Sequence, residues 1–175
     1  MAVLNPHDAP AAVAAAAVPL EDLLADDDHQ IGVELSRVIA VASVPRGRDV
    51  IERLAQAVLD AGIHRYRVTS ATRLPSPRDW RDILRRDVTE GALWPRRRVR
   101  RGRAVNHRTP DENRQVGELA DGIVDLIESH LGPVRAAAEL RTEHVQGLSL
   151  PGVWTRELLL ITDEWATTLY LWVSD

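Results

Sequence analysis

The segment from 109 to 173 restricts the fold more than any other part of the chain, because one well-marked helix is followed there by three strand-like stretches. The helix starts at Thr109-Pro110-Asp111-Glu112, which supplies an N-cap hydroxyl, a first-turn proline and a glutamate in the capping-box position. Apolar residues then recur at helical spacing until Gly132-Pro133. We therefore expect a long amphipathic helix between these two signals.

Strands follow this helix. Polar and apolar residues alternate over 134–144, which is the pattern of a half-buried strand. Residues 156–162 and 165–173 predict a hairpin that turns at Asp163-Glu164. The apolar run Leu158–Ile161 inside the hairpin predicts a strand that is buried on both faces.

Upstream, a second helix is expected over 50–61. Asp49 stands at its N-cap, Glu52 occupies the capping-box position and Gly62 follows its last residue. Apolar residues repeat along one side of this segment, so the helix should pack against the rest of the domain.

A third helix is predicted to start at Ser76-Pro77 and to run toward Gly91, because proline suits the first position of a helix. Strands are expected at 64–72 and at 33–44. The second of these is ambiguous, since its apolar residues also fit a helical stripe. We interpret it as a strand.

This order of elements predicts an α+β fold: one mixed, mainly antiparallel sheet with about three helices packed on one face and a C-terminal β-hairpin. Residues 31–175 should form a single domain with a basic loop at about 94–108. Residues 1–30 combine an Ala-rich tract, three prolines and an acidic run, Asp26-Asp27-Asp28. With little to bury, they are predicted to be a flexible acidic tail.

Composition excludes several kinds of site and location. The chain has no cysteine, which rules out disulfides, thiolate zinc sites and cysteine nucleophiles. No apolar run approaches the ~20 residues that cross a bilayer. The stretch 11–18 has no basic residue before it and lies between Pro10 and Pro19, so it does not match a signal peptide. We expect a cytoplasmic protein without a membrane partner.

Every one of the 22 basic residues is an arginine, and the chain has no Lys and no Phe. Because the codons of both missing residues are AT-rich, a GC-rich bacterial genome explains both absences. Arginine is suited to phosphate and carboxylate recognition. Its abundance alone is therefore weak support for such a function in this chain.

Positive charge is concentrated in residues 63–110, which hold 14 arginines and four acidic residues. Just after Trp94, six arginines fall within eight residues: Arg96, Arg97, Arg98, Arg100, Arg101 and Arg103. Such a run can follow a phosphate backbone while the indole stacks on a base. His107 and Arg108 lead into the helix N-terminus at Thr109, where free N–H groups favour anions.

These arginines, with His107 and Arg108, are candidates for binding an anion or nucleic acid. A solvated loop, or neutralisation by the acidic tail or by an acidic protein partner, would account for the same pattern. The negative net charge of the whole chain, −4, counts against a dedicated nucleic-acid-binding domain.

The sequence contains no recognisable catalytic or metal-binding constellation. No two of its six histidines have the spacing of metal ligands, so we predict no metal and no cofactor. The stretch Gly147-Leu148-Ser149-Leu150-Pro151 imitates a nucleophile elbow, but a turn and a strand follow it where that motif needs a helix. We assign no catalytic residue.

The tryptophans offer candidate contact residues. Trp165 and Trp172 are seven positions apart, so on one strand they point to opposite faces. One of them should reach an outer surface where a partner can dock, unless a helix covers it. Together with Trp94, they are our candidates for partner contact.

By elimination, the first hypothesis is a non-enzymatic binding or regulatory protein that acts through protein–protein contacts, such as an adaptor, an immunity-type inhibitor or an assembly subunit. The alternative is a nucleic-acid-binding protein that uses the loop Arg96–Arg103. A small enzyme acting on an anionic substrate near His107 is the third hypothesis. The sequence identifies neither the partner nor the pathway, and it leaves a homo-oligomer open.

Overall fold

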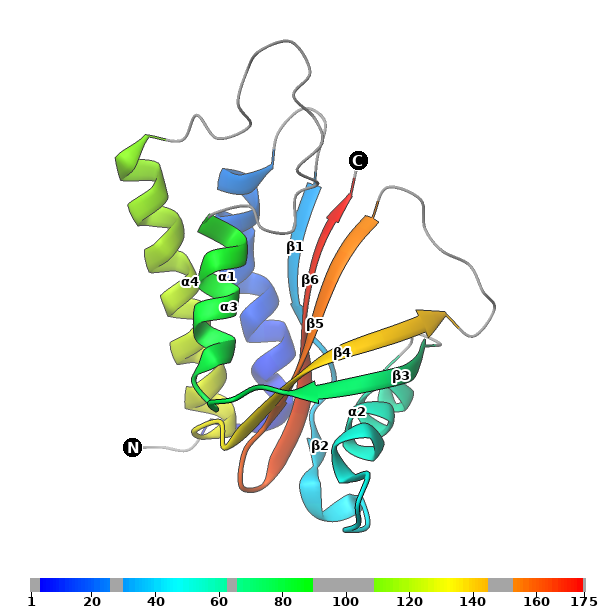
Figure 1. Ribbon diagram of the computed structural model, residues 1–175. Coiled ribbons are helices and arrows are strands. Elements are labelled where there is room, and N and C mark those ends of the chain that lie inside the picture. The colour runs from blue at the N-terminus through cyan, green and yellow to red at the C-terminus, as the bar shows by residue number, and fades with distance from the viewer. Residues whose placement is uncertain (1–3, 26–29, 63–65, 90–108, 145–152, 175) are drawn as a thin grey trace.

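A computed structural model describes the chain over residues 4–25, 30–62, 66–89, 109–144 and 153–174. In these residues, six strands form one sheet with the order β1-β6-β5-β4-β3, and β2 also pairs with β6 (Figure 1). The strands are β1 (Gln30–Leu35), β2 (Ile39–Ala40), β3 (Tyr66–Arg73), β4 (Ala136–His144), β5 (Val153–Ile161) and β6 (Trp165–Ser174). Every pairing is antiparallel.

The described part of the chain also contains four α-helices and two short 3-10 helices. They are η1 (Pro6–Asp8), α1 (Ala9–Leu24), η2 (Val41–Ser43), α2 (Val50–Ala61), α3 (Asp79–Thr89) and α4 (Pro110–Leu131). The α+β class and the C-terminal hairpin, formed by β5 and β6, are confirmed. The sheet is antiparallel in all its described pairs, so it is not mixed.

Helices lie on both sides of the sheet (Figure 1). The larger core joins α1, α3 and α4 to one face and includes Trp80, Ile123 and Leu158. A smaller core joins α2 to the other face around Leu54 and Leu159. Three helices share one face, as expected, but α2 is not among them and α1 takes its place. The apolar run of β5 contributes to both cores, as its sequence predicted.

The helix α1 is a correction to the flexible tail predicted for 1–30. Its buried residues recur along one side of the helix: Ala9, Val13, Ala17, Leu20 and Leu24. Small side chains at the first three of these positions allow α1 to pack closely on its neighbours. An Ala-rich segment buries little area by itself, so its helical state depends on docking against the sheet and α4.

Both edge strands of the sheet are tied to helix side chains. Glu21 of α1 accepts a hydrogen bond from the backbone N–H of Val33 in β1 at 3.0 Å. In the same way, the Gln56 amide of α2 donates to the carbonyl of Tyr66 and accepts from the N–H of Val68 in β3, at 3.0 and 2.9 Å. These contacts satisfy edge groups that would otherwise be open to another strand.

The start of α4 follows its local sequence signal. Thr109 Oγ1 accepts from the N–H of Glu112 at 3.2 Å, and Glu112 accepts from the N–H of Thr109 at 2.6 Å, so the predicted capping box is confirmed. The capping box predicted at Asp49 is not formed, because this residue stands at the N-cap of α2 without a side-chain hydrogen bond.

Two further boundaries differ from the prediction. The helix expected from Ser76 begins at Asp79, whose carboxylate accepts from the Ser76 N–H at 2.8 Å and holds the preceding turn. The single strand expected over 33–44 is divided into β1, β2 and η2.

Candidate functional site

A row of polar and aromatic side chains crosses three neighbouring strands on the α2 side of the sheet. Glu34 of β1 pairs with Tyr170 of β6, and Tyr170 pairs with Glu157 of β5. Beside this row, Trp172 of β6 pairs with Thr155 of β5. We call these five residues the open face, because α2 packs on the other end of this side of the sheet and no described helix lies over them (Figure 1).

Glu157 lies at the point where two strands separate. The pairing of β4 with β5 ends at Leu140 and Glu157, and beyond it β4 diverges from β5 (Figure 1). The Glu157 side chain is only 8% exposed and forms hydrogen bonds with the hydroxyls of Thr142 and Thr168. Burial raises the pKa of its carboxyl group, and the two hydroxyls only partly oppose this effect. Among the described residues, no arginine forms an ion pair with it.

Tyr170 lies between the two carboxylates of the row. Burial of Tyr170, together with the neighbouring Tyr66 phenol and the carboxylates of Glu157 and Glu34, raises the pKa of its own phenol to about 12, although a hydrogen bond with Thr155 opposes the shift. The phenol is therefore neutral at physiological pH. A phenol with this pKa is suited to hydrogen bonding and aromatic contact, but not to acting as a base.

Trp172 is held in one orientation on the open face. Its indole N–H donates to Glu34 Oε1 at 2.9 Å, and its ring lies over Gly32 so closely that a Cβ at that position would overlap the ring. Glycine is required here because the backbone and the indole approach each other directly. The ring is half-buried and belongs to the surface of the sheet.

On the opposite face, Arg156 joins β5 to α3. Its Nε lies 2.5 Å from Asp87 Oδ2, and its Nη1 donates to Glu139 Oε1 at 2.7 Å. The first contact is an ion pair without hydrogen-bond alignment. Asp87 has no exposed side-chain surface and also contacts Arg86. Burial raises the pKa of Asp87, while Arg156 and Arg86 act in the opposite direction.

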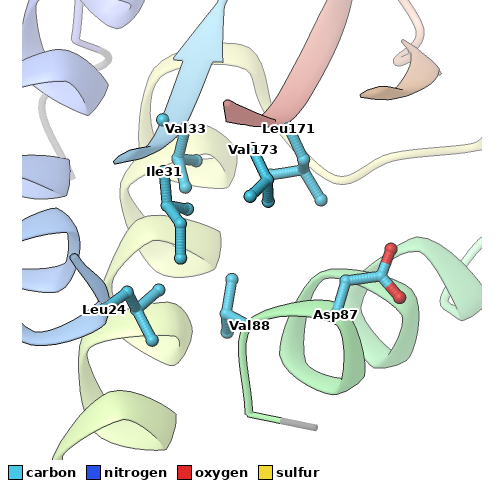
Figure 2. Close-up of a pocket in the computed structure, with 8 residues that line it drawn as sticks. Leu24, Ile31, Val33, Asp87, Val88, Leu171 and Val173 are labelled. Atoms are coloured by element: carbon cyan, nitrogen blue, oxygen red, sulfur yellow. The ribbon is translucent and has the colours of Figure 1, made fainter. Parts of the chain in front are cut away.

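Asp87 also borders a small cavity between α1, α3, β1 and β6. Figure 2 shows its carboxylate directed away from the apolar side chains that line the rest of this space. Those side chains are Leu24, Ile31, Val33, Val88, Leu171 and Val173. The cavity measures about 10 Å³, which is room for about one water molecule. Sites for small ligands are far larger, so this space does not suit a substrate.

Most of the residues predicted as anion or nucleic-acid contacts lie outside the described part of the chain. These are Trp94, Arg96, Arg97, Arg98, Arg100, Arg101, Arg103, His107 and Arg108. The other two candidates are described and face opposite sides of the sheet, as their spacing predicted. Trp165 packs against the larger core and makes an edge contact with His7, with ring centroids 5.4 Å apart. Trp172 belongs to the open face.

Sequence reasoning missed Glu34, Glu157 and Tyr170. A signal for Glu157 was present, because it precedes Leu159 and Ile161 at alternate positions of a strand with apolar residues on both faces. A carboxylate at such a position is expected to be buried. Its neighbours come from other strands, and their identity depends on the strand register.

The described residues contain no group of three His, Asp or Glu side chains arranged to hold a metal ion. Within the same residues, none of the helices has the length and apolar character to cross a membrane. Comparison with known proteins returns no matching family model, no matching curated protein and no matching solved structure.

Proposed function

We propose that the protein is a non-enzymatic binding or regulatory protein, such as an adaptor, an immunity-type inhibitor or an assembly subunit, whose protein partner docks on the open face. The observation that supports this proposal is the pair Trp172 and Tyr170, both half-buried on a sheet face that no described helix covers. Trp and Tyr supply a large share of binding energy at protein interfaces. Because Trp172 is already fixed by Gly32 and Glu34, its ordering on binding costs little entropy.

The edges of the sheet favour the same surface. Glu21 occupies an N–H group of β1, and Gln56 occupies backbone groups of β3. A partner that added a strand would have to displace these side chains. Docking on the face of the sheet requires no such displacement.

Glu157 also deserves comparison with a catalytic acid or base, since buried carboxyls with raised pKa values are common in active sites. A catalytic carboxyl must reach the substrate. Glu157 is instead almost fully buried and already hydrogen-bonded to Thr142 and Thr168. Its environment therefore favours binding over catalysis.

Site-specific photocrosslinking in the native host tests this proposal. A photoreactive amino acid at Thr155, an exposed position of the open face, is expected to yield a discrete protein adduct. The same amino acid at Asp125, exposed on α4, is the control and should not yield that adduct. Trp172→Ala should weaken the adduct by at least about tenfold, the scale of an interface hot spot. No adduct at Thr155, or one insensitive to Trp172→Ala, would refute the proposal.

The nucleic-acid alternative is supported by the concentration of arginine at Arg96–Arg103. It predicts binding to short duplex or single-stranded nucleic acid that weakens steeply with salt, because each neutralised phosphate releases counterions. Replacing the six arginines of this segment by Ser should abolish that binding. If the wild-type protein does not bind nucleic acid at about 50 mM salt, this alternative is excluded.

A further inference from the structure

We infer that the open face receives a cationic side chain, an arginine, from a basic segment of the protein partner. This inference rests on the proposed function and names the chemistry of the partner at that same surface.

Two carboxylates flank one phenol in the central row of the open face. Residues directly opposite each other on antiparallel strands have Cβ atoms about 5 Å apart, so Glu34 and Glu157 both lie close to Tyr170. Burial is the main cause of the raised pKa of Tyr170, and the two carboxylates beside it add to the shift. A cation above Tyr170 could contact the exposed carboxylate of Glu34, and the buried Glu157 beneath it would add to the attraction without direct contact.

No arginine of these strands balances this potential. Among the described residues of β1, β5 and β6, the only arginine is Arg156, and its side chain lies on the opposite face with Asp87 and Glu139. Within the described part of the chain, the partners of Glu157, the next residue of β5, are hydroxyl groups. Burying a carboxylate without a cation carries a free-energy cost. An arginine supplied by the partner would offset it.

Trp172 completes the recognition of a guanidinium group. Because Nε1, Cε2 and Cζ2 of its ring fill the space beside Gly32, a cation has to approach the indole from the side that points away from the β1 backbone. An indole beside carboxylates fits arginine better than lysine, since the planar guanidinium stacks on the ring and donates several hydrogen bonds in a fixed fork. Glu34 supplies a carboxylate that is exposed and already oriented by its bond with the indole.

The probe is a tri-arginine peptide with blocked ends, compared with a tri-citrulline peptide that has nearly the same shape and no charge. Each is added to the full-length protein while the indole N–H resonance of Trp172, assigned with a Trp172→Phe variant, is followed by NMR. We expect saturable shifts with tri-arginine and none with tri-citrulline. Glu34→Gln and Glu157→Gln should each weaken tri-arginine binding several-fold, and the double variant by at least about tenfold.

Glu143→Gln is the matched control, because Glu143 is an exposed residue of β4 on the opposite face of the sheet. It should leave the affinity unchanged. Equal binding of both peptides, or tri-arginine binding that does not move the Trp172 resonance, would overturn the inference. If that happens while the Thr155 crosslink persists and still requires Trp172, the proposed function stands and only the arginine is wrong. If the tri-arginine shifts and the Trp172-dependent crosslink are both absent, the arginine inference and the proposed function are both wrong.

Discussion

Arg156 and Glu157 are consecutive residues of β5 whose side chains lie on opposite faces of the sheet. The partners of Arg156 are charged, whereas those of Glu157 are hydroxyl groups. Arg156 contacts two carboxylates, those of Asp87 and Glu139, on the side of α3. Glu157 is buried on the other side with the hydroxyls of Thr142 and Thr168. The strand therefore joins an ion pair on one face to a carboxyl group on the other that no cation of the described residues compensates.

This difference predicts that Glu157→Gln stabilises the protein near neutral pH. Burial raises the folded-state pKa of Glu157 above its ordinary value of 4.5, so the folded protein binds this proton more tightly than the unfolded chain. The stability that the group contributes therefore falls as pH rises from about 4.5 through the folded pKa, and it stays low above that pKa. At pH 7 we expect the variant to gain about 1–3 kcal/mol in the free energy of unfolding, the range for a poorly compensated buried polar group.

Urea unfolding at about pH 4 and pH 7 measures this effect. The gain should shrink at the lower pH, where Glu157 is protonated and resembles the amide. Glu143→Gln, at an exposed position, should change stability by less than about 0.5 kcal/mol at either pH. A loss of stability at pH 7 in Glu157→Gln would contradict the assignment of Glu157 as an uncompensated charge.

The ion pair on the helical face should respond in the opposite way. Arg156→Met alone leaves the fully buried Asp87 without its main cation and should cost about 3–5 kcal/mol. Asp87→Leu alone leaves Arg156 paired with Glu139 and should cost less. The double variant Asp87→Leu with Arg156→Met should cost much less than the sum, because neither charge is then left behind. A double-mutant cycle by urea unfolding gives the coupling. Additive losses would mean that the two residues do not act as a pair.

Local signals in the sequence predicted the elements that depend on local contacts. The capping box at Thr109 and the alternation of polar and apolar residues along β4 are both carried by neighbours in the chain. The side of the sheet that α2 covers depends on long-range packing against Leu159 and Ala166, which no local signal reports. The open face has the same origin, since Glu34 and Glu157 are brought to Tyr170 by strand register alone.

Two helix N-caps can be compared directly: the Thr109 side chain makes a cap hydrogen bond and the Asp49 side chain does not. Thr109→Ala removes the hydroxyl that accepts from the Glu112 N–H, and should lower the free energy of unfolding by about 1 kcal/mol. Asp49→Ala should have little effect through capping, because the Asp49 side chain makes no cap hydrogen bond. Thermal unfolding of both variants measures the two losses of stability. Thr109→Ser should retain most of the stability, since it keeps the hydroxyl, and an equal loss in Thr109→Ala and Asp49→Ala would contradict the difference.

The last prediction concerns α1, which composition alone assigned to a flexible tail. Leu20 is completely buried between α1 and its neighbours, whereas Val18, two residues earlier in the same helix, is 51% exposed. Because α1 is part of the larger core, Leu20→Ala should cost about 2–5 kcal/mol, the range for a large apolar side chain removed from a packed interior. Val18→Ala should change stability by about 0.5 kcal/mol or less. Urea unfolding distinguishes the two cases, because a flexible segment would make both substitutions neutral. If both substitutions had equal and negligible effects, residues 9–24 would be a flexible tail. The larger core would then consist of α3, α4 and the sheet without α1.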